Sequence, residues 1–74
     1  MEIKELSEIL KNKYKKAQKG EAVVSIHLFG IEYAEIINKK GYKVSQIIKF
    51  AEMKKSYSTE LSKGIKLTKY VKLR

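Results

Sequence analysis

The chain contains no cysteine and no proline. Without cysteine, neither a disulfide nor a thiolate-bound metal can stabilise the fold, so hydrophobic packing has to supply the core. A chain of 74 residues buries only about 60% of the surface that it exposes when unfolded. There is also no low-complexity run and no internal repeat that would indicate a linker. We therefore expect a single domain over residues 1–74, built as a small helical bundle.

Long hydrophobic runs are also missing. The most apolar stretch, residues 22–31, is about half as long as a membrane-spanning helix, and Glu32 and Glu35 follow it directly. The first eight residues, MEIKELSE, are acidic and lead into no hydrophobic segment of the kind found in a signal peptide. These features predict a soluble cytoplasmic protein.

Residues suited to catalysis or metal binding are few. His27 is the single histidine, and its position in an apolar segment favours a buried, hydrogen-bonded side chain over a metal ligand or a catalytic base. The sequence has neither a glycine-rich phosphate loop nor a nucleophile elbow. We therefore expect no catalytic residue, no metal site and no cofactor, and we do not expect an enzyme.

Positive charge is abundant and concentrated in the second half of the chain. The formal net charge is +9. Six lysines balance six glutamates in residues 1–37, whereas residues 38–74 contain ten lysines and Arg74 against Glu52 and Glu60. A one-sided basic surface attracts polyanions, of which nucleic acid is the first candidate. The alternative is a lysine-rich surface that serves only solubility.

The spacing of hydrophobic residues predicts an all-α fold with four to five short helices. The expected helices cover residues 2–18, 21–29, 31–40, 44–53 and 55–63. Each of the four glycines, Gly20, Gly30, Gly41 and Gly64, follows a helical pattern as a C-terminal cap would. Alternation over residues 24–28 also fits a short strand. The tail, residues 65–74, fits either an extended segment or one or two further helical turns.

The segment AEMKKSYSTELSKG, residues 51–64, resembles the helix-turn-helix of the lambda-repressor-like (Cro/Xre-type) DNA-binding domains. The similarity covers residues 47–66, and the matching positions are Ala51, Met53, Lys55, Ser56, Tyr57, Thr59, Glu60, Leu61, Lys63 and Gly64. Three positions differ from the family pattern. Glu52 stands in place of the turn glycine, Lys54 in place of a capping Ser or Thr, and Ser58 in place of a core aliphatic residue.

The resemblance implies a role for individual residues. The second helix of the motif would enter the major groove of double-stranded DNA. The expected base-contacting residues are Lys54, Lys55, Ser56, Thr59, Glu60 and Lys63. The expected phosphate contacts are Lys43, Lys49, Lys66, Lys69 and Lys72. The residues expected to hold the two helices together are Ile47, Ile48, Ala51, Met53, Tyr57 and Leu61.

These expectations describe a DNA-binding transcriptional regulator whose core is built by the helices preceding the motif. One such module is small for tight specific binding, so a homodimer is expected to read two half-sites about one helical turn apart. The alternative function is that of a basic helical interaction module that binds an acidic protein partner or structured RNA.

Overall fold

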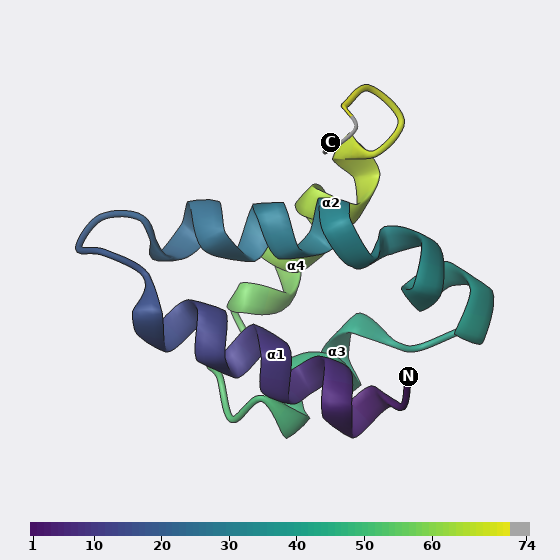
Figure 1. Cartoon of the computed structure of the whole chain (residues 1–74), viewed down its shortest axis with the longest axis horizontal. Helices are drawn as coiled ribbons and strands as arrows, with labels where there is room; N and C mark the ends of the chain where they lie inside the picture. The colour runs from purple at the N-terminus through teal and green to yellow at the C-terminus, as the bar shows by residue number, and fades with distance from the viewer. Residues whose placement is uncertain (72–74) are drawn as a thin grey trace.

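The computed structural model of the chain describes residues 1–71, which form four helices. These are α1 (Ile3–Lys16), α2 (Ala22–Lys40), α3 (Val44–Phe50) and α4 (Tyr57–Leu67). Helices α1 and α2 form an antiparallel pair, and α4 crosses α2 on the side away from the viewer (Figure 1). Helix α3 packs against α1 and α4. The expected all-α fold is confirmed.

Helix α1 begins and ends where the charges of its sequence predict. The backbone N–H of Glu2 donates to the carboxylate of Glu5 at 3.3 Å, which satisfies a donor that the helix itself leaves free. The last turn contains Lys13, Lys15 and Lys16, which interact favourably with the negative end of the helix dipole. The helix predicted at residues 2–18 is therefore confirmed, with slightly shorter ends.

Helix α2 is continuous from Ala22 to Lys40. The predicted break at Gly30 is wrong, and so is the alternative of a strand over residues 24–28. Gly30 is buried in the middle of the helix, where the absence of a side chain leaves room for the backbone of α4. Gly41 does end the helix as expected, with φ of 69° and its backbone N–H donating to the carbonyl of Asn38 at 3.3 Å.

Two glycines allow the backbones of α2 and α4 to touch. A Cβ atom placed on Gly30 would lie 2.9 Å from the backbone nitrogen of Ile65. A Cβ atom on Gly64 would lie 2.5 Å from the carbonyl oxygen of His27. Gly64 is therefore not the C-terminal cap predicted from the sequence, because α4 continues through it to Leu67. Both glycines are present because any side chain there would push the two helices apart.

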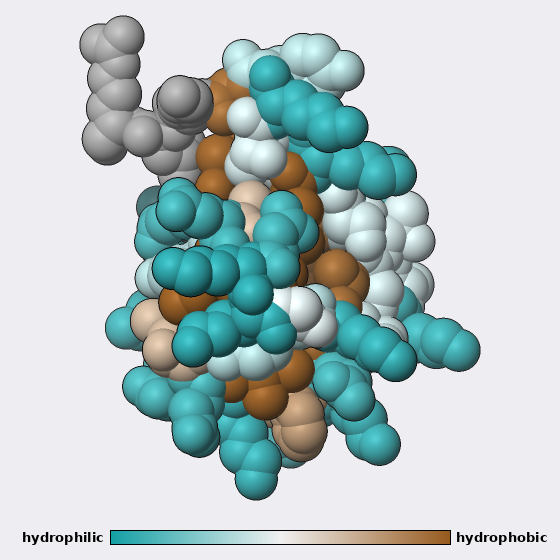
Figure 2. All heavy atoms as spheres, turned by 90° about the vertical axis from the view of Figure 1, so that its right-hand side faces the viewer, coloured by the Kyte–Doolittle hydropathy of each residue, from teal (hydrophilic) through white to brown (hydrophobic). Residues whose placement is uncertain are grey.

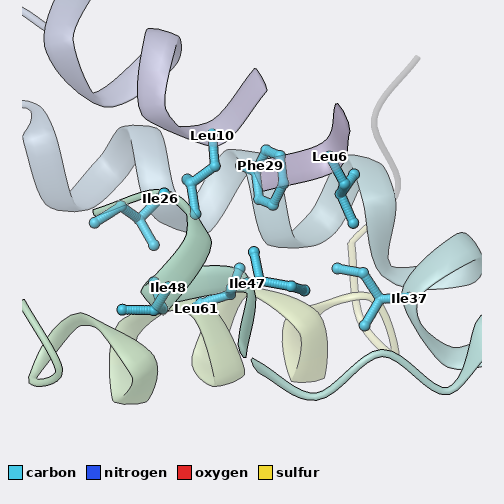
Figure 3. Packing of buried hydrophobic residues seen from close by; sticks show 9 residues of the cluster. Leu6, Leu10, Ile26, Phe29, Ile37, Ile47, Ile48 and Leu61 are labelled. Atoms are coloured by element: carbon cyan, nitrogen blue, oxygen red, sulfur yellow. The ribbon is translucent and has the colours of Figure 1, made fainter. Parts of the chain in front are cut away.

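The hydrophobic core lies between all four helices. Figure 3 shows Leu6 and Leu10 of α1 pointing toward residues of the other three helices. The other buried apolar side chains are Ile26, Phe29, Ala34, Ile37, Ile47, Ile48, Ala51 and Leu61. The hydroxyl of Ser7, which is also buried, donates to the carbonyl of Ile3 at 2.7 Å. The helices that precede the motif therefore build most of the core, as expected.

The last two helices differ in their bounds from the prediction. Helix α3 ends at Phe50 and not at Met53. Helix α4 begins at Tyr57, two residues later than expected, and extends four residues further. The beginning of the tail is thus helical up to Leu67, and Tyr70 closes a turn by donating its N–H to the carbonyl of Leu67 at 2.9 Å. Residues 72–74 of the tail lie outside the described residues.

The close contact of α2 and α4 predicts that a larger residue at position 64 destabilises the fold. Gly64→Ala is expected to lower the free energy of unfolding by about 2 kcal/mol, because the clash with the backbone of α2 outweighs the gain in helix propensity. Chemical denaturation measures this change. Thr59→Ala, at an exposed position of the same helix, serves as control and should stay within about 0.5 kcal/mol of the parent chain. A Gly64→Ala chain as stable as the parent would contradict the close crossing.

Candidate nucleic-acid interface

Helix α3 ends in a backbone conformation that usually requires glycine, but the residue at this position is Glu52. Glu52 adopts a φ of 59°, in the left-handed region that favours glycine. Its N–H donates to the carbonyl of Lys49 at 3.0 Å, and the N–H of Met53 donates to that of Ile48 at 3.1 Å. This pair of bonds defines a Schellman motif that ends α3. Glu52 thus occupies the position of the turn glycine and also adopts its conformation.

The side chain of Glu52 ties this turn to the first helix. Its carboxylate forms an ion pair with the ammonium group of Lys11 on α1. The hydrogen bond from Lys11 lowers the pKa of the Glu52 carboxyl, and the same bond raises the pKa of Lys11. Both groups are therefore charged near neutral pH. The pair links the turn to α1 across 41 positions of the sequence.

Two polar side chains at the start of α4 lack the hydrogen bonds that usually stabilise a helix start. Ser56 is the N-cap residue, but its side chain makes no capping hydrogen bond. The hydroxyl of Ser58 is buried and has no hydrogen-bond partner within residues 1–71. These two serines lie in or beside the segment in which the sequence differs from the repressor pattern. The missing cap at Ser56 costs about 1 kcal/mol, and the unpaired hydroxyl of Ser58 costs about 1–3 kcal/mol.

The inner face of α4 packs against the remainder of the domain. Leu61 is fully buried. The ring of Tyr57 lies edge-on to that of Tyr14, with 5.3 Å between the ring centroids, and the two hydroxyls are hydrogen-bonded at 3.1 Å. Tyr57 is therefore the partly buried core aromatic residue expected from the sequence. These contacts fix the rotation of α4 about its own axis.

Glu60 lies partly buried against α2. Nε2 of His27 donates to its Oε1 at 2.9 Å, and Nζ of Lys63 lies 3.6 Å from its Oε2. The hydrogen bond from His27 lowers the pKa of the Glu60 carboxyl. Glu60 was expected to contact bases, but the helix crossing brings it beside His27, and only 25% of its side chain is exposed. His27 was predicted to be buried and hydrogen-bonded; the hydrogen bond is present, but the side chain is not buried, since 27% of it is exposed.

The other residues expected to contact bases lie on the outer face of α4 and in the segment directly before it. Ser56, Thr59 and Lys63 are exposed and follow one another at spacings of three to four residues, which places them on one side of the helix. Lys66 and Tyr70 continue the same line and are also exposed. Lys54 and Lys55 are exposed in the turn that precedes α4. We call this set the outer stripe, and it consists of Lys54, Lys55, Ser56, Thr59, Lys63, Lys66 and Tyr70.

The lysines expected to contact phosphate lie on several segments around the motif. Lys43 precedes the first residue of α3, Lys49 lies in its last turn, and both are exposed. Lys69 is exposed in the turn after α4, whereas Lys72 lies outside the described residues. Hydrophilic side chains cover most of the flank shown in Figure 2 and leave a narrow hydrophobic band between them.

Two contacts of the site were not indicated by the sequence. Lys11 belongs to the electrically neutral half of the chain, and no local pattern pairs it with Glu52. The sequence predicts that Gly64 ends a helix, whereas in the structure its missing side chain allows α2 to pack directly against the backbone of α4. The positive φ of Glu52 could have been predicted, because the family pattern has a glycine at this position.

The fold and the turn together define the class of protein. Two helices, α3 and α4, are joined by a short connection, residues 51–56, and supported by two earlier helices, which is the general arrangement of a helix-turn-helix domain. A family model described as an HTH-like domain matches residues 2–74. The chain therefore belongs to this family of HTH-like domains. No curated protein and no solved structure gives a significant match.

Within residues 1–71, no helix has the length and hydrophobicity needed to cross a membrane. In the same part of the chain, no three His, Cys, Asp or Glu side chains come together in a group that could hold a metal ion.

The conformation of Glu52 leads to a prediction for the turn. Glu52→Gly and Glu52→Ala both remove the ion pair with Lys11, but only glycine adopts a positive φ without strain. We expect the glycine variant to be more stable than the alanine variant by about 1 kcal/mol. Thermal or urea unfolding of the two variants gives the comparison. Equal stabilities would show that residue 52 does not adopt the left-handed conformation in solution.

Proposed function

We propose that this protein binds double-stranded DNA as a transcriptional regulator and places the outer stripe of α4 in the major groove. The observation that supports this proposal is the division of α4 into two faces. One face is held by α2 and the core, whereas Ser56, Thr59 and Lys63 on the other face are exposed. A helix held rigidly on one side can present the other side to a groove that is wide enough for an α-helix.

The residues of the outer stripe have the chemistry that base reading needs. Lys54, Lys55 and Lys63 can donate to O6 and N7 of guanine, and the hydroxyls of Ser56 and Thr59 can bond with either type of base. Lys54, Lys55 and Ser56 lie directly before the first turn of α4. In a recognition helix it is this N-terminal end that contacts the base edges. Glu60 is not included, because His27 and Lys63 engage its carboxylate.

The surrounding lysines supply the electrostatic part of the binding. Lys43, Lys49, Lys66 and Lys69 are exposed on or beside α3 and α4, and we assign them to phosphate contacts. Lys72 has the same proposed role from its place in the sequence. Contacts to phosphate fix the position of a protein on the duplex and provide most of its nonspecific affinity.

The mutational test separates base reading from phosphate contact. A preferred duplex is first selected from a random pool. Lys55→Ala and Thr59→Ala are then expected to reduce the preference for it over a random duplex, by about 1–3 kcal/mol for a residue that makes a direct base contact. Lys69→Ala should weaken both duplexes equally and reduce the slope of log affinity against log salt by about one. Lys15→Ala, at an exposed position of α1, is the control and should change neither quantity.

The salt dependence of the parent chain decides between the proposed ligand and the alternatives. With six or more phosphate contacts, affinity should fall about a thousandfold between 50 and 200 mM salt. A flat salt response would contradict the proposal. A hairpin RNA bound more tightly than every selected duplex would favour structured RNA as the ligand, and the absence of binding to either nucleic acid would favour an acidic protein.

A further inference from the structure

A shallow groove of about 500 Å³ lies between the second half of α1 and the first half of α2. Its apolar lining includes Ile9 of α1, Ala17 directly after α1, and Val24 and Leu28 of α2. Val24 is 51% exposed and Leu28 is 46% exposed. Two large aliphatic side chains beside an open groove form a hydrophobic surface that the domain does not cover with its own residues 1–71.

The charges around this groove are of both signs. Lys13 and Lys16 line the groove on the α1 side. Glu32 and Glu35 are exposed on α2, and they follow Leu28 by four and seven residues on the same side of the helix. Within residues 1–71, no ion pair involves any of these four side chains. Glu21 also lines the groove, directly before α2. One end of the surface therefore has two lysines and one glutamate and is net basic, the other end is acidic, and the aliphatic side chains lie between them.

Such a surface is complementary to itself. In a two-fold symmetric dimer the same patch faces its own copy in the opposite direction. If the two copies of α2 cross near Leu28, an antiparallel arrangement brings the Glu32–Glu35 end of one helix beside the start of the other. The start of α2 adjoins Lys13 and Lys16 across the groove. Each copy would thus contribute one basic and one acidic end to the interface.

The distribution of net charge favours the same arrangement. Residues 1–37, which contain α1 and the groove, have equal numbers of lysines and glutamates, whereas the excess of +9 lies in residues 38–74. Two copies can therefore approach through α1 and α2 without strong repulsion. Contact through α3 and α4 would bring together two strongly basic surfaces.

We propose that a second copy of this chain occupies the groove between α1 and α2, with Val24 and Leu28 at the centre of a symmetric interface. This inference goes beyond the proposed function, because the dimer would form in the absence of DNA. It would also leave the outer stripe of both copies uncovered. The interface would suit the reading of two half-sites that the sequence leads us to expect, but the proposal does not depend on DNA binding.

Sedimentation of the DNA-free protein tests the hydrophobic part of the proposal. The parent chain is expected to be a dimer at about 100 µM. Leu28→Glu should weaken dimerisation at least tenfold, about the loss expected for a central apolar contact. Phe50→Glu is the matched control, because Phe50 is similarly exposed, at 41%, but lies on α3. Circular dichroism checks that each variant remains folded.

Charge reversal tests whether the partner is a copy of the same chain. Lys13→Glu/Lys16→Glu makes both ends of the surface acidic, and Glu32→Lys/Glu35→Lys makes both ends basic. Each double variant by itself should be a monomer, and mixing the two should restore a dimer, because the substituted ends then face ends of opposite net charge. A parent chain that remains monomeric, a Leu28→Glu chain that still dimerises, or a mixture that stays monomeric would overturn the proposal. None of these results bears on whether the monomer binds DNA.

Discussion

The contact between the backbones of α2 and α4 determines what the remainder of the molecule can present to a partner. Gly30 and Gly64 remove the side chains that would separate the two helices, so that the carbonyl of His27 and the backbone of α4 nearly touch. This contact fixes the position of α4, and the Tyr14–Tyr57 pair and Leu61 fix its rotation. Its exposed side is consequently rigid, although neither α4 nor α3 is long enough to be stable alone.

Net charge is distributed unevenly along the chain. The first half is electrically neutral and builds the α1–α2 pair, whereas the second half has all of the net charge and forms the helix-turn-helix. The Lys11–Glu52 ion pair joins the two halves at the turn. This separation supports both proposals, since a basic surface is suited to phosphate and a neutral surface is suited to a second copy of the chain.

The sequence predicts the helices better than it predicts their connections. Hydrophobic spacing and terminal charges identify α1, and the family resemblance identifies the pair α3 and α4, since these signals are local. The helix break at Gly30 was wrongly predicted because a glycine that admits a neighbouring backbone has the same local sequence signature as one that ends a helix. The inward turn of Glu60 was missed for a related reason. Its partner, His27, lies 33 positions away and becomes its neighbour only through the helix crossing.

Backbone amide NMR of the protein titrated with its selected duplex tests most directly whether α4 is the DNA-binding helix. The account predicts that the largest shift changes occur in residues 54–59 and at Lys63 and Lys66. It also predicts little change along the groove between α1 and α2. Large changes along that groove, with none in α4 or in the turn before it, would contradict the account.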